Sequence, residues 1–259
     1  MVMDTAPTRS GETEVVVIVK AAPQVGQRRG ETVCCAGIDL YGNRLRLYPV
    51  AFRTLDDGQK FRRWDRIRFK WRMPTDDGRA ESRRVDQDSI AIEGELKRSE
   101  REAFLARSIV TGINKEMEAG RSLALLKPRV IDFRAEKKKQ AEVDAEIKAF
   151  AVLHAQSDLF NTKAIIPYQP CPYSFKYRYE TDDGKRDGTC QDWEMEATFF
   201  NWRKRYSEEQ ALAEMGRVFG EEYPAKGMLF AMGTHSLYPE TWLINGVVRL
   251  DEVKQGTLF

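Results

Sequence analysis

The sequence has few of the residues on which metal sites and disulfide frameworks depend: four cysteines and two histidines in 259 residues. The cysteines show no repeated spacing, which argues against a disulfide framework and against a Cys-x-x-Cys zinc pair. No apolar run is long enough to span a bilayer, and the first residues lack the apolar core of a signal peptide. We therefore expect a reduced, cytoplasmic protein with no membrane partner.

Phosphate-binding glycine motifs are also missing. The glycines form neither a phosphate-cradling loop nor a dinucleotide fingerprint, so we expect no bound cofactor. What is present is charge, because 32% of the residues are charged while 42% are hydrophobic. The chain is therefore expected to be globular with a heavily charged surface, and its net charge of +2 does not identify a partner.

The N-terminal half contains several short patterns typical of β-strands. Residues 14–20 form a β-branched run, and residues 32–38 and 44–48 flank a turn at Tyr41, Gly42 and Asn43. Residues 65–73 alternate strictly, with Ile67, Phe69 and Trp71 on one face and basic residues on the other. These patterns predict a small, curved or barrel-like β domain.

The C-terminal part mixes strand and helix signals. Residues 173–179 alternate aromatic and polar side chains and precede a turn-rich segment, which predicts a hairpin. Asp192 is expected to cap a helix that starts at Trp193, and Ser207 with Gln210 is typical of a capping box for a second helix that ends near Gly220. Residues 228–232 and 242–244 are expected to be two further strands.

These patterns predict an α+β protein with an N-terminal small β-barrel-like domain, a helical segment and a C-terminal α+β unit. The predicted organisation is a flexible N-terminus at residues 1–13, a β-rich basic domain with a helical insertion at 14–135, a charged linker at 136–170, an α+β domain at 171–250 and a tail at 251–259.

A dense basic stretch is the main candidate for ligand contact. Cations neutralise phosphates, and exposed aromatic rings stack on unpaired bases, so the interleaving of both favours nucleic acid, DNA or RNA. The alternative is a solvated outer sheet face with every aromatic side chain in the core. Within the stretch, Arg62, Arg63 and Trp64 are the best combined basic and stacking contact. The candidate residues are Arg62, Arg63, Trp64, Arg66, Arg68, Lys70 and Arg72.

Catalytic machinery is sparse, and no catalytic set is assigned. His235 follows an apolar strand, and Asp192 and Glu194 are carboxylates of the kind that binds a divalent metal in a nuclease-like site. Residues two apart on a helix do not share a face, so a solvated first helical turn is the simpler interpretation of the two carboxylates. No metal site is predicted.

Two copies of a Gln-x-x-Leu-Phe pattern stand in positions expected to be accessible. One is Gln156, Leu159 and Phe160 in the predicted linker, and the other is Gln255, Leu258 and Phe259 at the end of the chain. The pattern resembles the pentapeptide by which bacterial polymerases and mismatch-repair proteins dock on the sliding clamp. The resemblance implies polar rim contacts for the glutamines and an apolar pocket for the Leu-Phe pairs.

Together these features favour a non-enzymatic DNA-associated accessory factor in replication or repair. It would bind nucleic acid through the basic β face and dock on the sliding clamp through the C-terminal motif. The alternative is a nucleic-acid-processing enzyme, nuclease-like or nucleotide-modifying, in a phage-defence or mobile-element context. A third possibility is a module that binds only protein.

Overall fold

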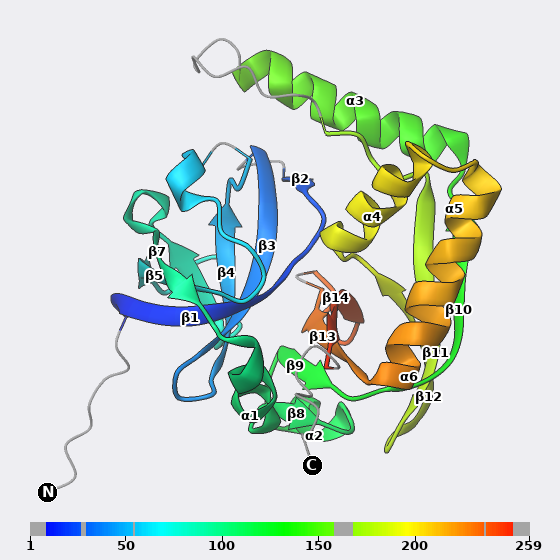
Figure 1. Cartoon of the computed structure of the whole chain (residues 1–259). Helices are drawn as coiled ribbons and strands as arrows, with labels where there is room; N and C mark the ends of the chain where they lie inside the picture. The colour runs from blue at the N-terminus through cyan, green and yellow to red at the C-terminus, as the bar shows by residue number, and fades with distance from the viewer. Residues whose placement is uncertain (1–8, 27–29, 54, 158–167, 236, 251–259) are drawn as a thin grey trace, which may run out of the picture.

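The computed structural model describes residues 9–26, 30–53, 55–157, 168–235 and 237–250. It is an α+β protein in which a barrel of N-terminal strands packs against a second, mixed sheet (Figure 1). In the described residues, no helix combines the length and the apolar character that a membrane crossing requires.

The first sheet is built from the N-terminal strands. These are β1 (Ser10–Lys20), β2 (Gln24–Gly26), β3 (Gly30–Asp39), β4 (Arg44–Val50), β5 (Asp65–Arg72), β6 (Ser82–Val85) and β7 (Ala91–Glu95), with short 3-10 turns η1 (Asp57–Gln59), η2 (Gln87–Ser89) and η3 (Arg98–Glu100).

The strands pair in the order β1-β3-β4-β6-β5, and β5 pairs back to β1. The pairing closes a five-stranded barrel, in which β4 and β6 are parallel and the other pairs are antiparallel. This order and its parallel closing pair are the topology of the OB fold. The predicted barrel-like N-terminal domain is thereby confirmed.

The alternation predicted for residues 65–73 appears in β5. Ile67 and Phe69 are fully buried inside the barrel, while Arg68 and Lys70 are exposed. The predicted hairpin forms between β3 and β4, and Gly42 adopts a φ of 90° in its turn. Positive φ at that position favours glycine, which has no Cβ to clash.

The second sheet is formed by strands that lie later in the chain, in the order β10-β11-β12-β14-β13-β9-β8. They are β8 (Ile109–Val110), β9 (Leu123–Leu126), β10 (Arg129–Lys137), β11 (Tyr173–Thr181), β12 (Gly184–Cys190), β13 (Met228–Thr234) and β14 (Trp242–Arg249). Strands β8 to β10 therefore belong to the second sheet, although they lie mostly within the range 14–135 that the sequence assigned to the basic domain.

Six helices and one π-helical segment accompany these strands in the described part of the chain. They are α1 (Arg101–Ala106), α2 (Asn114–Glu118), α3 (Gln140–Ser157), α4 (Trp193–Arg203), α5 (Glu208–Met215), the π-helical η4 (Gly216–Glu222) and α6 (Tyr223–Lys226). The range 136–170, predicted as a charged linker, thus contains α3.

Both predicted helix caps are present. Asp192 accepts the backbone N–H of Glu194, and Ser207 and Gln210 form a reciprocal capping box. The predicted end near Gly220 is wrong, because α5 runs on through η4 and α6 to Lys226. Gly227 follows with a φ of 89°.

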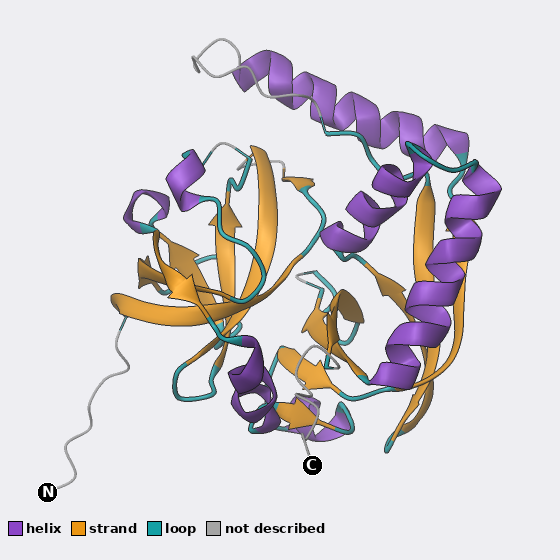
Figure 2. Ribbon diagram, viewed as in Figure 1, coloured by secondary structure: helices purple, strands orange, loops and turns teal. Residues whose placement is uncertain are grey.

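The second sheet is covered on both faces (Figure 2). One face packs on α4, α5 and η4, where Phe230 joins Met195, Phe199 and Met215 in one core cluster. On the other face, Leu229 and Ala231 of β13 pack with Val16 and Ile18 of β1. Burial on both faces explains the unbroken apolar run Met228–Met232.

Candidate nucleic-acid interface

The basic side chains of β5 lie on the outside of the barrel, flanked by β1, β6 and β7. In the β1 to β5 register, Glu12 lies opposite Lys70 and Glu14 lies opposite Arg68. Residues that face each other across antiparallel strands have neighbouring side chains on the same face. The neighbours of each cation therefore depend on the register and not on the sequence around it.

The first half of the basic face is neutralised by carboxylates. Arg66 Nε lies 2.6 Å from Glu14 Oε1, and Arg68 Nη2 lies 2.5 Å from Glu93 Oε1. Arg68 also lies 3.4 Å from Glu12. Exposed ion pairs of this kind contribute little to stability, but each carboxylate opposes the approach of a phosphate.

The second half of the face is different. Lys70 and Arg72 are exposed, and Arg84 of β6 lies opposite Arg72 in the register. Among the described residues, no ion pair involves any of these three side chains. Half-buried Tyr48 of β4 lies beside Arg84 in the parallel β4 to β6 pair. We call these four residues, Tyr48, Lys70, Arg72 and Arg84, the open row.

Arg63 and Trp64 do not form the stacking contact that the sequence predicts. Trp64 is only 6% exposed, has a φ of 76° and stacks under Arg101, whose guanidinium carbon lies 4.4 Å from the ring centroid. Arg63 is turned into the boundary between the two sheets, where it meets Asp192 and Glu194. Only Arg62 of this trio is exposed.

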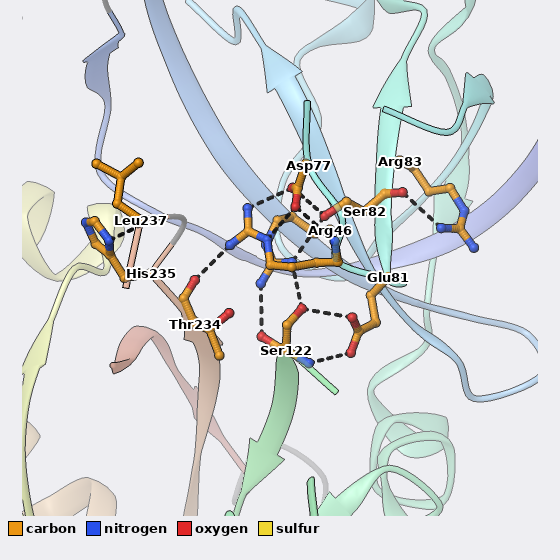
Figure 3. A network of polar contacts seen from close by, with 10 residues as sticks. Arg46, Asp77, Glu81, Ser82, Arg83, Ser122, Thr234, His235 and Leu237 are labelled. Carbon is orange, nitrogen blue, oxygen red and sulfur yellow. Dashed lines mark hydrogen bonds and ion pairs between the residues drawn. The ribbon is translucent and has the colours of Figure 1, made fainter. Parts of the chain in front are cut away.

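A polar network closes the barrel against the second sheet (Figure 3). Arg46 is 2% exposed and donates from Nη1 to the hydroxyls of Ser82 and Ser122, at 3.2 and 2.9 Å. Glu81 accepts the backbone N–H and the hydroxyl of Ser122 at 2.7 and 2.8 Å. Burial opposes ionisation of Glu81, yet these hydrogen bonds hold its pKa below the ordinary value.

The loop between β5 and β6 is part of the same network. Arg79 donates from Nε and Nη2 to the two carboxylate oxygens of Asp77, at 2.8 Å each, and from Nη1 to the carbonyl of Thr234 at 2.8 Å. Burial alone would raise the pKa of Asp77, but the hydrogen bonds from Arg79 and Ser82 outweigh it and lower the pKa to about 2.

Packing of the second sheet at this network limits how much of the outer barrel surface is accessible to a ligand. OB barrels bind oligonucleotides on the face of their second and third strands, which here are β3 and β4. Arg46 of β4 and Ile38 of β3 are buried, and Ile38 packs with Leu125 and Leu229 of the second sheet. The second sheet therefore covers part of this face, while Tyr48 of β4 remains partly accessible to solvent.

Tyr48 is one of the aromatic residues interleaved with the basic stretch, but neither Tyr48 nor Arg84 is among the candidate contact residues that the sequence predicts. Both stand in short alternating segments, RLRLYPV and SRRV, and a search for basic or aromatic residues at alternate strand positions would have included them. Their proximity to Arg72 depends on the pairing of β6 with both β4 and β5, which the sequence does not encode locally.

The three candidate catalytic residues are not assembled into one site. Asp192 and Glu194 both contact Arg63, and Asp192 also accepts the backbone N–H of Val247 in β14. His235 follows the end of β13 that pairs with Trp242, five residues from Val247 along β14. That separation is roughly 16 Å at the rise of a strand. Within the described residues, no three His, Cys, Asp or Glu side chains are grouped to hold a metal.

A cavity of about 520 Å³ lies between α3, α4, the strands β11 and β12, and the connection from β1 to β2. Its ionisable lining includes Lys138, Glu142, Glu146 and Glu196. Burial raises the pKa of Glu196, which accepts a hydrogen bond from the Tyr168 hydroxyl. With three carboxyl groups against one ammonium, this cavity is a poor site for phosphate.

The Gln-x-x-Leu-Phe segments fall outside what the structure describes. Leu159, Phe160 and the whole of the C-terminal copy lie in the omitted ranges, and only the backbone of Gln156 is described, near the end of α3.

Two family models cover the chain. Residues 11–109 match a domain of unknown function (DUF8758), and residues 106–259 match a domain of unknown function (DUF8757). No curated protein matches the sequence.

Several solved structures are similar over much of their length. The p204 HINb domain is 7% identical with a TM-score of 0.34, covering 92% of this chain and 95% of that one. The tetrameric p202 HIN2 domain is 8% identical with a TM-score of 0.31, covering 92% and 90%. A replication protein A heterotrimer bound to ssDNA is 9% identical with a TM-score of 0.25, covering 95% and 67%. Likeness at these TM-scores carries no information about function.

Proposed function

The chain belongs to the family of the domain of unknown function DUF8757, and we propose that it binds nucleic acid through the open row of its barrel. The observation that carries this proposal is the open row itself. Lys70, Arg72 and Arg84 lie on one outer face without an ion pair among the described residues, and Tyr48 lies beside Arg84 in the strand register.

The two halves of the basic face differ in the positive charge that is available to a phosphate. A cation that already holds a carboxylate must exchange that partner for a phosphate, whereas an unpaired cation gains the phosphate contact and releases a counterion. The neutralised half of β5 therefore contributes little, and the open row supplies the attraction. Three such contacts correspond to a salt dependence with a slope of about −2 for a single strand.

The proposal is tested by fluorescence anisotropy with a labelled oligothymidylate at low salt. Replacement of Arg72 and Arg84 by Gln should weaken binding by about tenfold or more, because two phosphate contacts are lost. The paired variant Glu14→Gln with Arg66→Gln is the control on the same face, since it removes one charge of each sign. Its affinity should stay within about twofold of the original.

A second control separates local from global charge. Arg217→Gln with Lys226→Gln also removes two positive charges, but from η4 and α6, outside the barrel. If this variant loses as much affinity as the open-row variant, or if the unmodified protein does not bind the oligonucleotide, the proposal is wrong.

Docking on a sliding clamp is a further proposal, supported by the sequence resemblance alone. Gln255, Leu258 and Phe259 would enter the clamp groove, and Gln156, Leu159 and Phe160 would provide a second contact. Deletion of residues 255–259 should abolish capture of a purified bacterial clamp in a pull-down. The internal copy is tested separately with Leu159→Ala and Phe160→Ala. Capture that survives both changes would contradict the proposal.

A further inference from the structure

The loop between β13 and β14 presents large side chains to solvent beside the polar network. Tyr238 is 65% exposed and Leu237 is 76% exposed. The backbone N–H of His235 donates to the carbonyl of Thr241, and the N–H of Thr241 donates to the carbonyl of Tyr238, at 2.9 Å each. The exposed side chains are therefore carried by a turn whose ends are hydrogen-bonded to each other.

His235 has a defined orientation in this loop. Its Nδ1 accepts the backbone N–H of Leu237 at 3.1 Å, so the neutral ring carries its proton on Nε2. The ring centroids of His235 and Tyr238 are 5.1 Å apart with an interplanar angle of 31°. One side of the Tyr238 ring is thus supported, and the exposed fraction of the residue leaves ring surface open to solvent.

The network in Figure 3 connects this loop to Ser82 of β6. Arg79 holds the carbonyl of Thr234, next to His235, and also holds Asp77. Asp77 in turn accepts the hydroxyl of Ser82 at 2.7 Å. Ser82 and Arg84 are two residues apart on β6, so they point to the same side of the strand. A series of hydrogen bonds therefore runs from the β13 to β14 loop to Ser82, on the side of β6 that also carries Arg84.

We propose that Tyr238, supported by His235, is a base-stacking contact for single-stranded nucleic acid whose phosphates lie along the open row. Unpaired bases expose their faces and stack on aromatic side chains, whereas the bases of a duplex are already stacked on each other. This inference rests on the proposed function, and it adds a substrate class, a single strand, and a contact from the second sheet.

The distribution of charge indicates that the β13 to β14 loop contacts bases and the open row contacts phosphates. The loop carries the exposed carboxylate of Glu240 and no Lys or Arg between residues 235 and 241. Arg79 is held by Asp77 in a bidentate pair. The loop is therefore suited to contact bases and not phosphates, and the positive charge that holds the strand comes from Lys70, Arg72 and Arg84.

The experiment compares Tyr238→Ala and Tyr238→Phe with the unmodified protein, by anisotropy on two oligonucleotides of equal length. One is oligothymidylate, and the other has abasic sites in place of the bases and therefore the same phosphate charge. Tyr206→Ala is the matched control, because Tyr206 is 47% exposed and follows α4 on the helical side of the second sheet. A thermal melt of each variant checks folding.

We expect Tyr238→Ala to weaken binding of oligothymidylate by about tenfold, the effect of losing one stacked base. Tyr238→Phe should restore most of the affinity, Tyr206→Ala should have no effect, and the abasic strand should bind Tyr238→Ala and the unmodified protein equally. The slope of log K against log salt should stay unchanged in Tyr238→Ala.

Two results would overturn the inference, and only the second would also contradict the proposed function. In the first, Tyr238→Ala binds oligothymidylate as tightly as the unmodified protein, while the Arg72 and Arg84 variant still binds more weakly. This result would exclude the stacking contact and leave the proposed function intact. Absence of binding by the unmodified protein would remove both.

Discussion

Arg63 of the barrel and Asp192 at the start of α4 form an ion pair, with 3.1 Å between Nη2 and Oδ2. The side chain of Asp192 is 3% exposed, and it also accepts the backbone N–H groups of Glu194 and Val247, at 2.8 Å each. One carboxylate therefore joins the barrel, the N-terminus of a helix and a strand of the second sheet. A residue considered as a catalytic candidate is accounted for by this structural role.

The first prediction concerns that carboxylate. Asp192→Ala should lower the free energy of unfolding by about 3–5 kcal/mol, because it leaves the buried charge of Arg63 without this partner and removes a helix cap. Urea denaturation measures the loss. Asp57→Ala is the control, since Asp57 is 96% exposed in its pair with Lys60, and it should change stability by less than about 1 kcal/mol. Equal losses in the two variants would contradict the role assigned to Asp192.

The second prediction concerns close packing between the two sheets. A Cβ on Gly246 of β14 would overlap the Cγ2 methyl of Val19 in β1. Gly246→Ala should therefore destabilise the protein by about 1–3 kcal/mol, and Val19→Ala in the same chain should restore part of the loss. Gly216→Ala is the control, because nothing lies within 4 Å of its added Cβ. Since Gly216 is helical, that variant should gain up to about 1 kcal/mol.

The third prediction follows from the low pKa of Asp77, about 2. A carboxyl group whose pKa is depressed on folding stabilises the folded state above its unfolded pKa, near 3.9, and loses that contribution as the pH falls toward the folded pKa. We expect about 1–2 kcal/mol from Asp77 to disappear between pH 5 and pH 2. Urea unfolding should show a smaller acid-induced loss in Asp77→Asn than in the unmodified protein, and identical losses would count against this assignment.

The fourth prediction separates the two halves of the basic face by their salt dependence. Arg72→Gln with Arg84→Gln should reduce the slope of log K against log salt by about 1.4, because each lost phosphate contact removes about 0.7 on a single strand. Glu14→Gln with Arg66→Gln should leave the slope unchanged, since Arg66 is paired with Glu14. Anisotropy titrations between about 50 and 200 mM salt provide the measurement. A reduced slope in the Glu14 and Arg66 variant would show that phosphate reaches the neutralised half.

Sequence patterns predicted the helices and strands well where the interactions that stabilise them involve residues close together in the chain. The alternation in β5 follows from burial of Ile67 and Phe69 inside the barrel, and the caps at Asp192 and Ser207 satisfy backbone groups a few residues away. The predicted helix end near Gly220 is wrong because Gly220 lies within the helical segment. A Cβ at this position would lie 3.0 Å from the Cβ of Phe133 in β10, which favours glycine there.

The candidate interface was only partly predictable. Arg72 and Lys70 were included in the basic stretch, but nothing near Arg66 and Arg68 in the sequence shows that they meet Glu14, Glu12 and Glu93, which come from distant strands. Trp64 looked available for stacking because its neighbours are basic. It is buried because it packs in a cluster with Val16 and Leu105, and because Arg101, 37 positions along the chain, stacks on its ring.

The sequence by itself determined the alternating strands, the capped helices and the concentration of positive charge near Arg62 to Arg72. Only the tertiary structure decided which of those charges are available. Strand register places carboxylates beside Arg66 and Arg68. It also places Arg84 beside Arg72 and Tyr48 beside Arg84, and packing of the second sheet closes the face around Arg46. Periodicity is a property of a few consecutive residues, whereas charge pairing and exposure depend on partners that are far away in the chain.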